Sequence, residues 1–260
     1  MVAATRGGIR QTGRGRILFW RGGSLWIGRA EESTGFHSHH AIQMTFALDD
    51  GELRLRSPGE DWKKYSAAIV PAHQDHAFDA RGELVALVFV EPESREGQAI
   101  RAQYCEGIAA LPDQTMRAEI AALAQAYEHK HSDQDLIERA RAVASGLAAV
   151  LATPPSPVDK RILRAIELLH EQLGQAINLS DIAEAVHLSP ERFRHLFIEQ
   201  TGIRFRPYVL WLRLSSSISA YAAGASLTDA SYAGGFADSA HFSRTFKRMF
   251  GVAPVSIRPE

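Results

Sequence analysis

One sequence pattern occurs twice between Leu179 and Gly251, and this duplication restricts the fold of the region more than any other feature of the chain. In each copy a short apolar segment is followed by a turn and by a second segment that contains two phenylalanines and ends at a glycine. The corresponding positions are Leu179, Phe193, Phe197 and Gly202 in the first copy, and Leu227, Phe242, Phe246 and Gly251 in the second. Two helices joined by a tight turn make a helix-turn-helix unit, so the pattern predicts two such units in one all-α domain.

Local signals give the boundaries of the first unit. Apolar residues at helical spacing predict a helix over 158–173, which precedes the duplicated pattern. Asn178 or Ser180 is expected to cap the next helix, because their side chains accept hydrogen bonds from free amides of a first turn. Ser189 followed by Pro190 is a favourable start for the helix after the turn.

A long helix over 207–223 is expected to join the two units. Seventeen helical residues span roughly 25 Å, so the joined units are expected to reach successive major grooves, which repeat every ~34 Å along DNA. In the second unit Ser226 or Thr228 is the expected N-cap, 234–236 the turn and 239–250 the last helix.

The last helix of each unit has an apolar side and a polar side, as expected of a helix that packs on a core and reads a major groove. Bidentate arginine contacts read guanine, whereas lysine, serine and backbone amides more often contact phosphate. The residues expected to contact DNA are Ser189, Glu191, Arg192, Arg194, His195, Ser239, Ala240, His241, Ser243, Arg244 and Lys247.

Length and charge agree with a two-domain protein. The chain has 260 residues and a formal net charge of −1, made up of −3 over residues 1–157 and +2 over 158–260. Cys105 is the only cysteine, so no intrachain disulfide forms; we expect it to be buried in a cytoplasmic, nucleoid-associated protein. The start of the chain lacks the apolar core of a signal peptide, and no apolar run is long enough for a membrane span.

The N-terminal half has the pattern of a β domain. Residues 1–16 are rich in glycine and arginine and are expected to form a flexible arm. Short β-type runs separated by turn residues over 17–95 predict a sandwich or barrel. Asp50-Gly51 between two of these runs predicts a β-hairpin.

Histidines concentrate in this domain. In a strand, His37 and His39 share one face, Gln43 has the same parity, and His40 points to the other face. The stretch resembles the cupin family, whose barrel holds a metal or a small ligand through a His-x-His pair, a following carboxylate and a later histidine; the candidate ligand-binding residues are Phe36, His37, His39, Gln43 and His76, of which His37, His39 and His76 are the candidate metal ligands. Gln43 stands where the family has glutamate, and His73 replaces a turn glycine. A divalent metal, an organic ligand or purely structural hydrogen bonding remain three possibilities for this cluster.

Two amphipathic helices are predicted within 96–152, with a break at 131–133. Their apolar seams suit either packing against the barrel or a helical bundle between two subunits, and we expect a homodimer contact here. Residues 153–158 contain three closely spaced prolines and form the expected linker. The DNA-binding domain is then expected over 159–260.

The C-terminal hundred residues resemble the DNA-binding domain of the AraC/XylS family of bacterial transcription regulators. The resemblance is carried by the stretch 235–254, Gly-Phe-Ala-Asp-Ser-Ala-His-Phe-Ser-Arg-Thr-Phe-Lys-Arg-Met-Phe-Gly-Val-Ala-Pro, with 179–186 and 205–208 before it. Gly234 and Ser217 depart from the family pattern, and a glycine inside a helix costs about 1 kcal/mol relative to alanine, so a weakened second unit is expected.

The resemblance implies an α+β two-domain protein with a cupin-like sensor barrel, a helical hairpin and a DNA reader. It implies binding to double-stranded promoter DNA, an unknown small-molecule effector, a homodimer, contact with RNA polymerase and no catalytic activity. The alternative is a metal-dependent cupin enzyme, or a metal sensor, fused to a DNA-binding tail, with a divalent metal in the barrel as the cofactor. A helical interaction module that binds no DNA is a third possibility.

Overall fold

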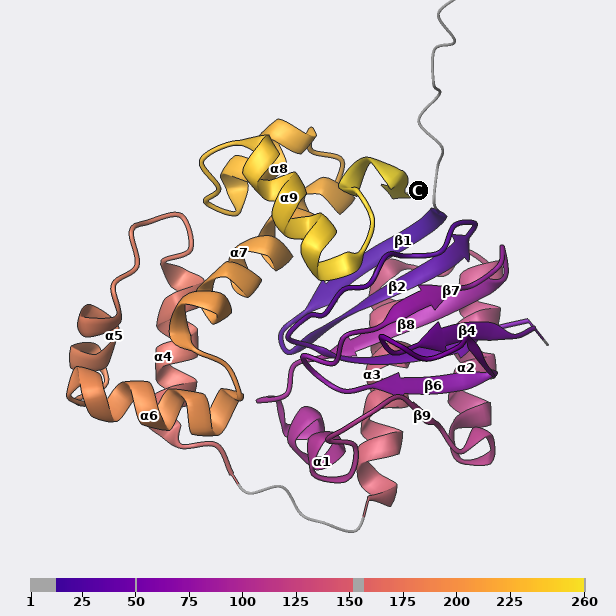
Figure 1. Ribbon diagram of the computed structural model, residues 1–260, viewed down its shortest axis with the longest axis horizontal. Coiled ribbons are helices and arrows are strands. Elements are labelled where there is room, and N and C mark those ends of the chain that lie inside the picture. Colours follow the sequence, from indigo (N-terminus) through magenta and orange to yellow (C-terminus); the bar gives the residue numbers. More distant parts are fainter. Residues whose placement is uncertain (1–12, 50, 152–156, 260) are drawn as a thin grey trace, which may run out of the picture.

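A computed structural model describes residues 13–49, 51–151 and 157–259 of the chain. Figure 1 shows a β domain with helices behind it and a separate group of helices that contacts one side of the β domain. The described strands are β1 (Gly13–Trp20), β2 (Gly23–Ala30), β3 (Ile42–Ala47), β4 (Leu53–Arg56), β5 (Lys63–Tyr65), β6 (Ala67–Val70), β7 (Ala77–Asp79), β8 (Leu84–Val90), β9 (Ala109–Ala110) and β10 (Ile257–Pro259).

The strands form two sheets. The larger has the order β10-β1-β2-β8-β3-β6-β9 and the smaller the order β5-β4-β7. Apolar side chains from both sheets, including Leu55, Phe78 and Val85, share one core. Alternate residues of the central strands, such as Met44 and Val88, point to the opposite face and form a second core. The predicted sandwich or barrel of short strands is therefore present, with both faces of its central strands buried.

Helices cover that second face. Their bounds are α1 (Arg95–Gln103), α2 (Asp113–Glu128) and α3 (Asp133–Val150), and Ser132 caps α3 by accepting from Asp135 N. Met116, Leu136 and Leu147 of the predicted seams are fully buried in the core shared with the sheet. These seam residues are therefore not free to form a bundle with a second subunit, because the sheet of the same chain already buries them.

Three further expectations for the N-terminal half are wrong. Residues 1–12 of the predicted arm lie outside the described residues, but 13–16 belong to β1 and pair with β2. The hairpin at 50–51 does not form, because β3 pairs with β6 and β8, whereas β4 pairs with β5 and β7. A turn signal is local, and here burial of both faces of β3 decides the pairing. Cys105 is exposed.

The C-terminal helices agree closely with the expected pattern. Their bounds are α4 (Lys160–Glu171), α5 (Leu179–Ala185), α6 (Pro190–Thr201), α7 (Phe205–Ala222), α8 (Leu227–Ala233) and α9 (Ser239–Phe250). Asn178, Ser189 and Ser226 cap α5, α6 and α8 through their side chains, and Asp238 caps α9. None of the described helices is sufficiently long and apolar to cross a bilayer. Residues 153–156 of the predicted linker lie outside the described residues, and Val158 at its end is buried in the helical core.

Gly234 does not weaken a helix, contrary to expectation. It is the C-cap residue that follows α8, and a Cβ there would lie 2.0 Å from Ser217 Oγ and 2.3 Å from Arg213 O of α7. The two departures from the family pattern, Gly234 and Ser217, are therefore in contact with each other. Both side chains must be small because α7 and α8 pack closely at this point.

The two halves of the chain share one hydrophobic core. Ile17, Ala41 and Phe89 of the β domain are buried together with the aromatic core of the C-terminal helices. Trp26 of β2 stacks on Phe250 of α9, with ring centroids 4.7 Å apart. Strand β10, which follows α9, pairs in parallel with β1. The second helix-turn-helix unit is thus fixed to the β domain in this structure.

Candidate nucleic-acid interface and interdomain histidine cluster

Helix α6 presents the predicted polar side to solvent. Phe193 and Phe197 are fully buried, which leaves Glu191, Arg192 and Arg194 exposed. His195 and the N-cap Ser189 are exposed as well. Glu191 accepts hydrogen bonds from Arg194 Nη1 and from His195 Nε2, at 2.5 and 2.9 Å. This surface ion pair holds Arg194 near the helix, whereas Arg192 projects freely from the same side.

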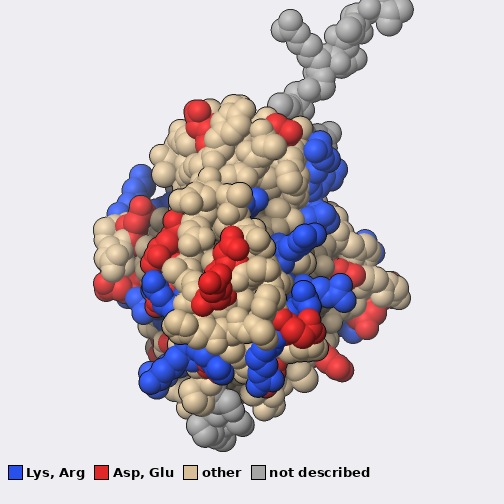
Figure 2. Space-filling view, turned by 90° about the vertical axis from the view of Figure 1, so that its left-hand side faces the viewer, with Lys and Arg blue, Asp and Glu red and all other residues tan. Residues whose placement is uncertain are grey.

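Helix α9 is arranged in the same way. Phe242 and Phe246 are buried, Ala240, His241, Arg244 and Lys247 are exposed, and Ser239 and Ser243 are half-buried. Arg244 and Lys247 form no ion pair within the part of the chain that the structure describes. Figure 2 shows the face of the molecule that carries α5 and α6, where Lys and Arg are interspersed with Asp and Glu. The positive charge available to DNA therefore lies on individual helix faces, not in one broad patch.

The two candidate reading helices are not parallel. Helices that are parallel in space remain parallel in every projection, and α6 and α9 run in clearly different directions in Figure 1. Insertion of both helices into successive major grooves of a straight duplex requires a common orientation. The structure therefore holds the two units in an arrangement that does not match the simplest expected docking.

Three of the predicted ligand residues form one buried cluster. His37 and His76 lie on adjacent segments joined by reciprocal backbone hydrogen bonds of 3.0 Å, and His39 completes the group. The side chains are almost inaccessible, at 6%, 3% and 0% for His37, His39 and His76. Their ring centroids lie 4.2 to 5.8 Å apart. Gln43 Oε1 lies 3.0 Å from His39 Nε2, so the predicted grouping of these four residues is present.

Backbone contacts fix the protonation of the three rings. The Nδ1 atoms of His37, His39 and His76 lie 2.9, 2.8 and 2.9 Å from the carbonyl oxygens of Gly35, Ala41 and Gln74. A carbonyl only accepts, so each Nδ1 carries a hydrogen and each neutral ring keeps its lone pair on Nε2. Burial lowers the pKa of all three histidines, that of His39 to about 3, which keeps them neutral at physiological pH.

The cluster lies directly against the second helix-turn-helix unit. Gly35 N donates a 3.0 Å hydrogen bond to the carbonyl of Gly251, the left-handed residue that ends α9. A Cβ at Gly251 would lie 2.7 Å from His37 Nδ1, so only glycine fits. The His39 ring stacks on Phe250 at a centroid distance of 5.8 Å. A change in the histidine cluster would therefore reach α9 through direct contacts.

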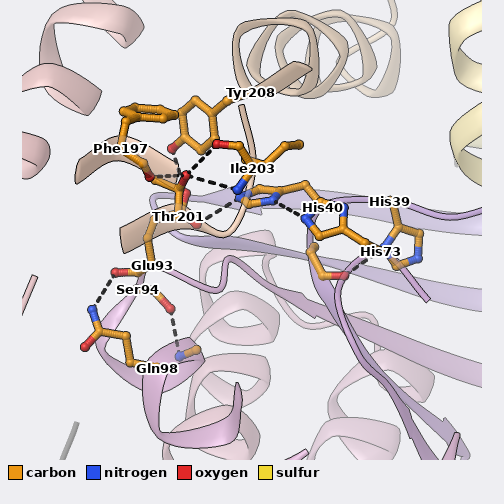
Figure 3. A network of polar contacts seen from close by, with 12 residues as sticks. His39, His40, His73, Glu93, Ser94, Gln98, Phe197, Thr201, Ile203 and Tyr208 are labelled. Carbon is orange, nitrogen blue, oxygen red and sulfur yellow. Dashed lines mark hydrogen bonds and ion pairs between the residues drawn. The ribbon is translucent and has the colours of Figure 1, made fainter. Parts of the chain in front are cut away.

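His40 belongs to a different network, in agreement with its predicted opposite orientation (Figure 3). Its Nε2 lies 2.9 Å from Glu93 Oε2, and its Nδ1 lies 3.3 Å from His73 Nε2. Glu93 also accepts a 2.6 Å hydrogen bond from the hydroxyl of Tyr208 on α7. Burial raises the pKa of Glu93, but the nearby His40 and the hydrogen bonds from His40 and Tyr208 outweigh it and lower the pKa overall. The sequence gave no signal for Glu93 or Tyr208, because their contact joins segments far apart in the chain.

Glu91 makes stability depend on pH at the same interface. Burial, with a further contribution from the charge of Glu93, raises the pKa of Glu91 from 4.5 to about 8. The folded protein thus keeps a proton that the unfolded chain releases above pH 4.5. The stability contributed by this proton is complete below pH 4.5 and is lost as the pH rises toward 8.

Replacing Glu91 with glutamine, which resembles the protonated acid, is therefore expected to flatten the pH dependence of stability between pH 5 and 8.5. At pH 8.5 the variant should have a Tm about 2–4 °C above that of the natural protein, equivalent to about one pKa unit in a protein of this size. Thermal unfolding followed by circular dichroism at pH 5, 7 and 8.5 measures this, with Glu106→Gln at an exposed position as control. An equal effect of Glu91→Gln at pH 5 and 8.5 would contradict the assignment.

An apolar cavity of about 120 Å³ lies beside the histidine cluster. Its walls include His37 and Gln43 from the cluster, Trp26 and Phe89 from the sheet, and Phe250 from α9. Phe36, also a predicted ligand residue, lies elsewhere: its ring is 47% exposed and stacks under the guanidinium of Arg56 at 4.8 Å. The cavity is therefore bounded by both halves of the chain, without a contribution from Phe36.

Residues 182–259 match a protein family described as "Helix-turn-helix domain". The chain is 30% identical over 95 residues to the Msm operon regulatory protein of Streptococcus mutans, covering 36% of this chain and 34% of that protein. It is 33% identical over 108 residues to the arabinose operon regulatory protein of Escherichia coli K12, covering 39% and 36%. The chain thus matches only about a third of the length of these curated relatives, and the matching region is the C-terminal one.

The whole architecture is similar to that of ToxT from Vibrio cholerae. The crystal structure of ToxT from strain O395 superposes with a TM-score of 0.58 at 16% identity, covering 90% of this chain and 96% of ToxT. The unsaturated fatty acid-bound ToxT of strain SCE256 gives a TM-score of 0.56 at 14% identity, covering 88% and 91%. At this identity the similarity concerns the fold, a β-rich N-terminal domain followed by a helical domain.

Proposed function

We propose, on the premise that residues 182–259 form a helix-turn-helix domain of the AraC/XylS type, that the whole protein is a transcription regulator that binds promoter DNA and responds to a small molecule. The observation that carries this proposal is the pair of helices α6 and α9, each with a buried phenylalanine side and an exposed polar side. The relatives named above are regulatory proteins of operons, which supports a regulator over an enzyme.

The effector site proposed is the apolar cavity at the domain interface. A ligand there would touch His37 and Trp26 of the β domain and Phe250 of α9 at once. Because a ligand shifts an equilibrium only through different affinities for two states, a site that both halves build is suited to control their docking. The unsaturated fatty acid bound to ToxT supports an apolar effector for the same architecture.

Regulation would act on the orientation of α9. The second unit is held against the sheet by Trp26 and by the hydrogen bond between Gly35 and Gly251, and in this state α6 and α9 are not parallel. Release of these contacts would let the second unit align with the first on DNA. We propose that the protein acts as an activator in the bacterial cytoplasm, on the nucleoid, as a homodimer that contacts RNA polymerase.

Replacing Arg244 with alanine is expected to weaken specific DNA binding by about 1–3 kcal/mol, roughly 5- to 150-fold, at one base position. Arg192→Ala should produce the same loss at a base read by α6. The measurement is fluorescence anisotropy at fixed salt, with duplexes selected from random sequence by the full-length protein. Arg161, exposed on α4 and paired with Asp159, provides the control as Arg161→Ala. Unchanged affinity in both variants would show that these faces do not read DNA.

A further inference from the structure

The three-histidine cluster contains one polar atom that the protein leaves without a partner. His76 Nε2 is buried and has no hydrogen-bond partner among the described residues. Leaving a buried polar atom unsatisfied costs about 1–3 kcal/mol, so such an atom needs an explanation. Two further imidazoles face it from His37 and His39, and one ring nitrogen from each of the three residues lies within 4.8 Å of the others.

We infer that His37, His39 and His76 bind a divalent transition-metal ion, with Zn²⁺ as the expected occupant. Neutral imidazole nitrogens are ligands of choice for zinc, and three histidines with one open position form a known type of zinc site. Nitrogens bound to one Zn²⁺ at 2.0–2.1 Å are about 3.4 Å apart in a tetrahedron, so small ring movements complete the set from the observed spacing.

The surroundings of the rings favour a metal over a purely hydrogen-bonded cluster. Each Nδ1–H is held by a backbone carbonyl, and this outer contact is the arrangement that orients metal-binding histidines and leaves Nε2 free as the ligand. A structural cluster needs donors for the Nε2 lone pairs, yet only the Gln43 amide reaches one of them, on His39. The adjacent cavity gives space for a water molecule or another small ligand in the fourth position.

A neighbouring pair of histidines offers an internal comparison. His40 and His73 are 3.3 Å apart at their nearest ring nitrogens, but His40 Nε2 is already hydrogen bonded to Glu93. This leaves fewer free ligand atoms than the cluster provides. A metal held by the cluster should therefore be insensitive to loss of His73.

The inference is tested by equilibrium dialysis of the full chain against Zn²⁺ followed by elemental analysis, and by titration with Co²⁺, whose visible absorption reports coordination. The expected result is one equivalent of metal per chain. His76→Gln should weaken binding at least about 100-fold, because removal of a direct ligand costs no less than loss of an outer contact. His73→Gln should bind as the natural protein does. Zn²⁺ should also raise the Tm of the natural protein and of His73→Gln, but not of His76→Gln.

Failure of the natural protein to retain Zn²⁺ or Co²⁺ would overturn the inference. It would also be overturned if His76→Gln retained the metal, or if His73→Gln lost it, because the ion would then lie at another position. Should His76→Gln fail to fold, as judged by circular dichroism, His37→Gln replaces it with the same expected result. Metal binding is measured here without DNA, so its outcome is separate from that of the proposed DNA-binding function, on which only a regulatory role of the metal depends.

Discussion

Replacing Glu93 with alanine is expected to reduce the free energy of unfolding by about 3–5 kcal/mol. Glu93 is 5% exposed and accepts hydrogen bonds from both His40 and Tyr208, so its removal leaves two buried polar groups without their acceptor. The loss should appear as a lower midpoint in urea denaturation followed by the fluorescence of Trp211, which lies at the same interface. A loss below 1 kcal/mol would contradict the role given to this network.

A double-mutant cycle assigns the contact between the domains. Tyr208→Phe alone should cost about 1–3 kcal/mol, whereas in a Glu93→Gln background, where the charged acceptor is already lost, the same change should cost clearly less. Tyr221, half-buried near the end of the same helix, supplies a matched control as Tyr221→Phe, with an expected effect within about 0.5 kcal/mol. Equal costs of Tyr208→Phe in the two backgrounds would mean that Glu93 and Tyr208 do not interact.

The second large effect concerns the core of each helix-turn-helix unit. Phe193 of α6 and Phe242 of α9 occupy equivalent positions and are both fully buried, so Phe193→Ala and Phe242→Ala should each cost about 3–5 kcal/mol. Each variant should lose footprinting protection mainly in the half of the DNA site that its own unit contacts. Ile198→Ala, at an exposed position of α6, is the control and should change stability by less than 1 kcal/mol. Full protection of both halves in Phe193→Ala would contradict two separate reading units.

The helical domain could be predicted because its signals are local. Caps such as Ser189 and apolar residues at helical spacing determine where a helix begins and which side is buried, and these signals require no knowledge of distant segments. The exposed positions of Arg192 and Arg244 followed from the buried positions of Phe193 and Phe242. The short strands β5, β7, β9 and β10 were missed, because two to three residues carry too little periodicity.

The site could be predicted only in part. Alternation along an extended chain correctly separated His40 from His37 and His39, although these residues lie in a loop with a single bridge to His76. Nothing in the local sequence indicated that Glu93 would meet Tyr208, or that His37 would contact Gly251, since both contacts join the two domains. Domain docking depends on side chains that are far apart in sequence, and one sequence contains no direct record of such pairs.

Strand β10 has a consequence for how the protein is made. Its pairing with Gly13–Gly15 covers the outer edge of β1, so the sheet has an open edge until residues 257–259 have been synthesised. During translation the β domain can form most of its core while β1 still exposes free backbone groups, which favour pairing with other chains. A fragment that ends before α4 would retain that open edge permanently and should aggregate more readily than the full chain. The last part of the DNA-binding half thus protects the first strand of the other half from self-association.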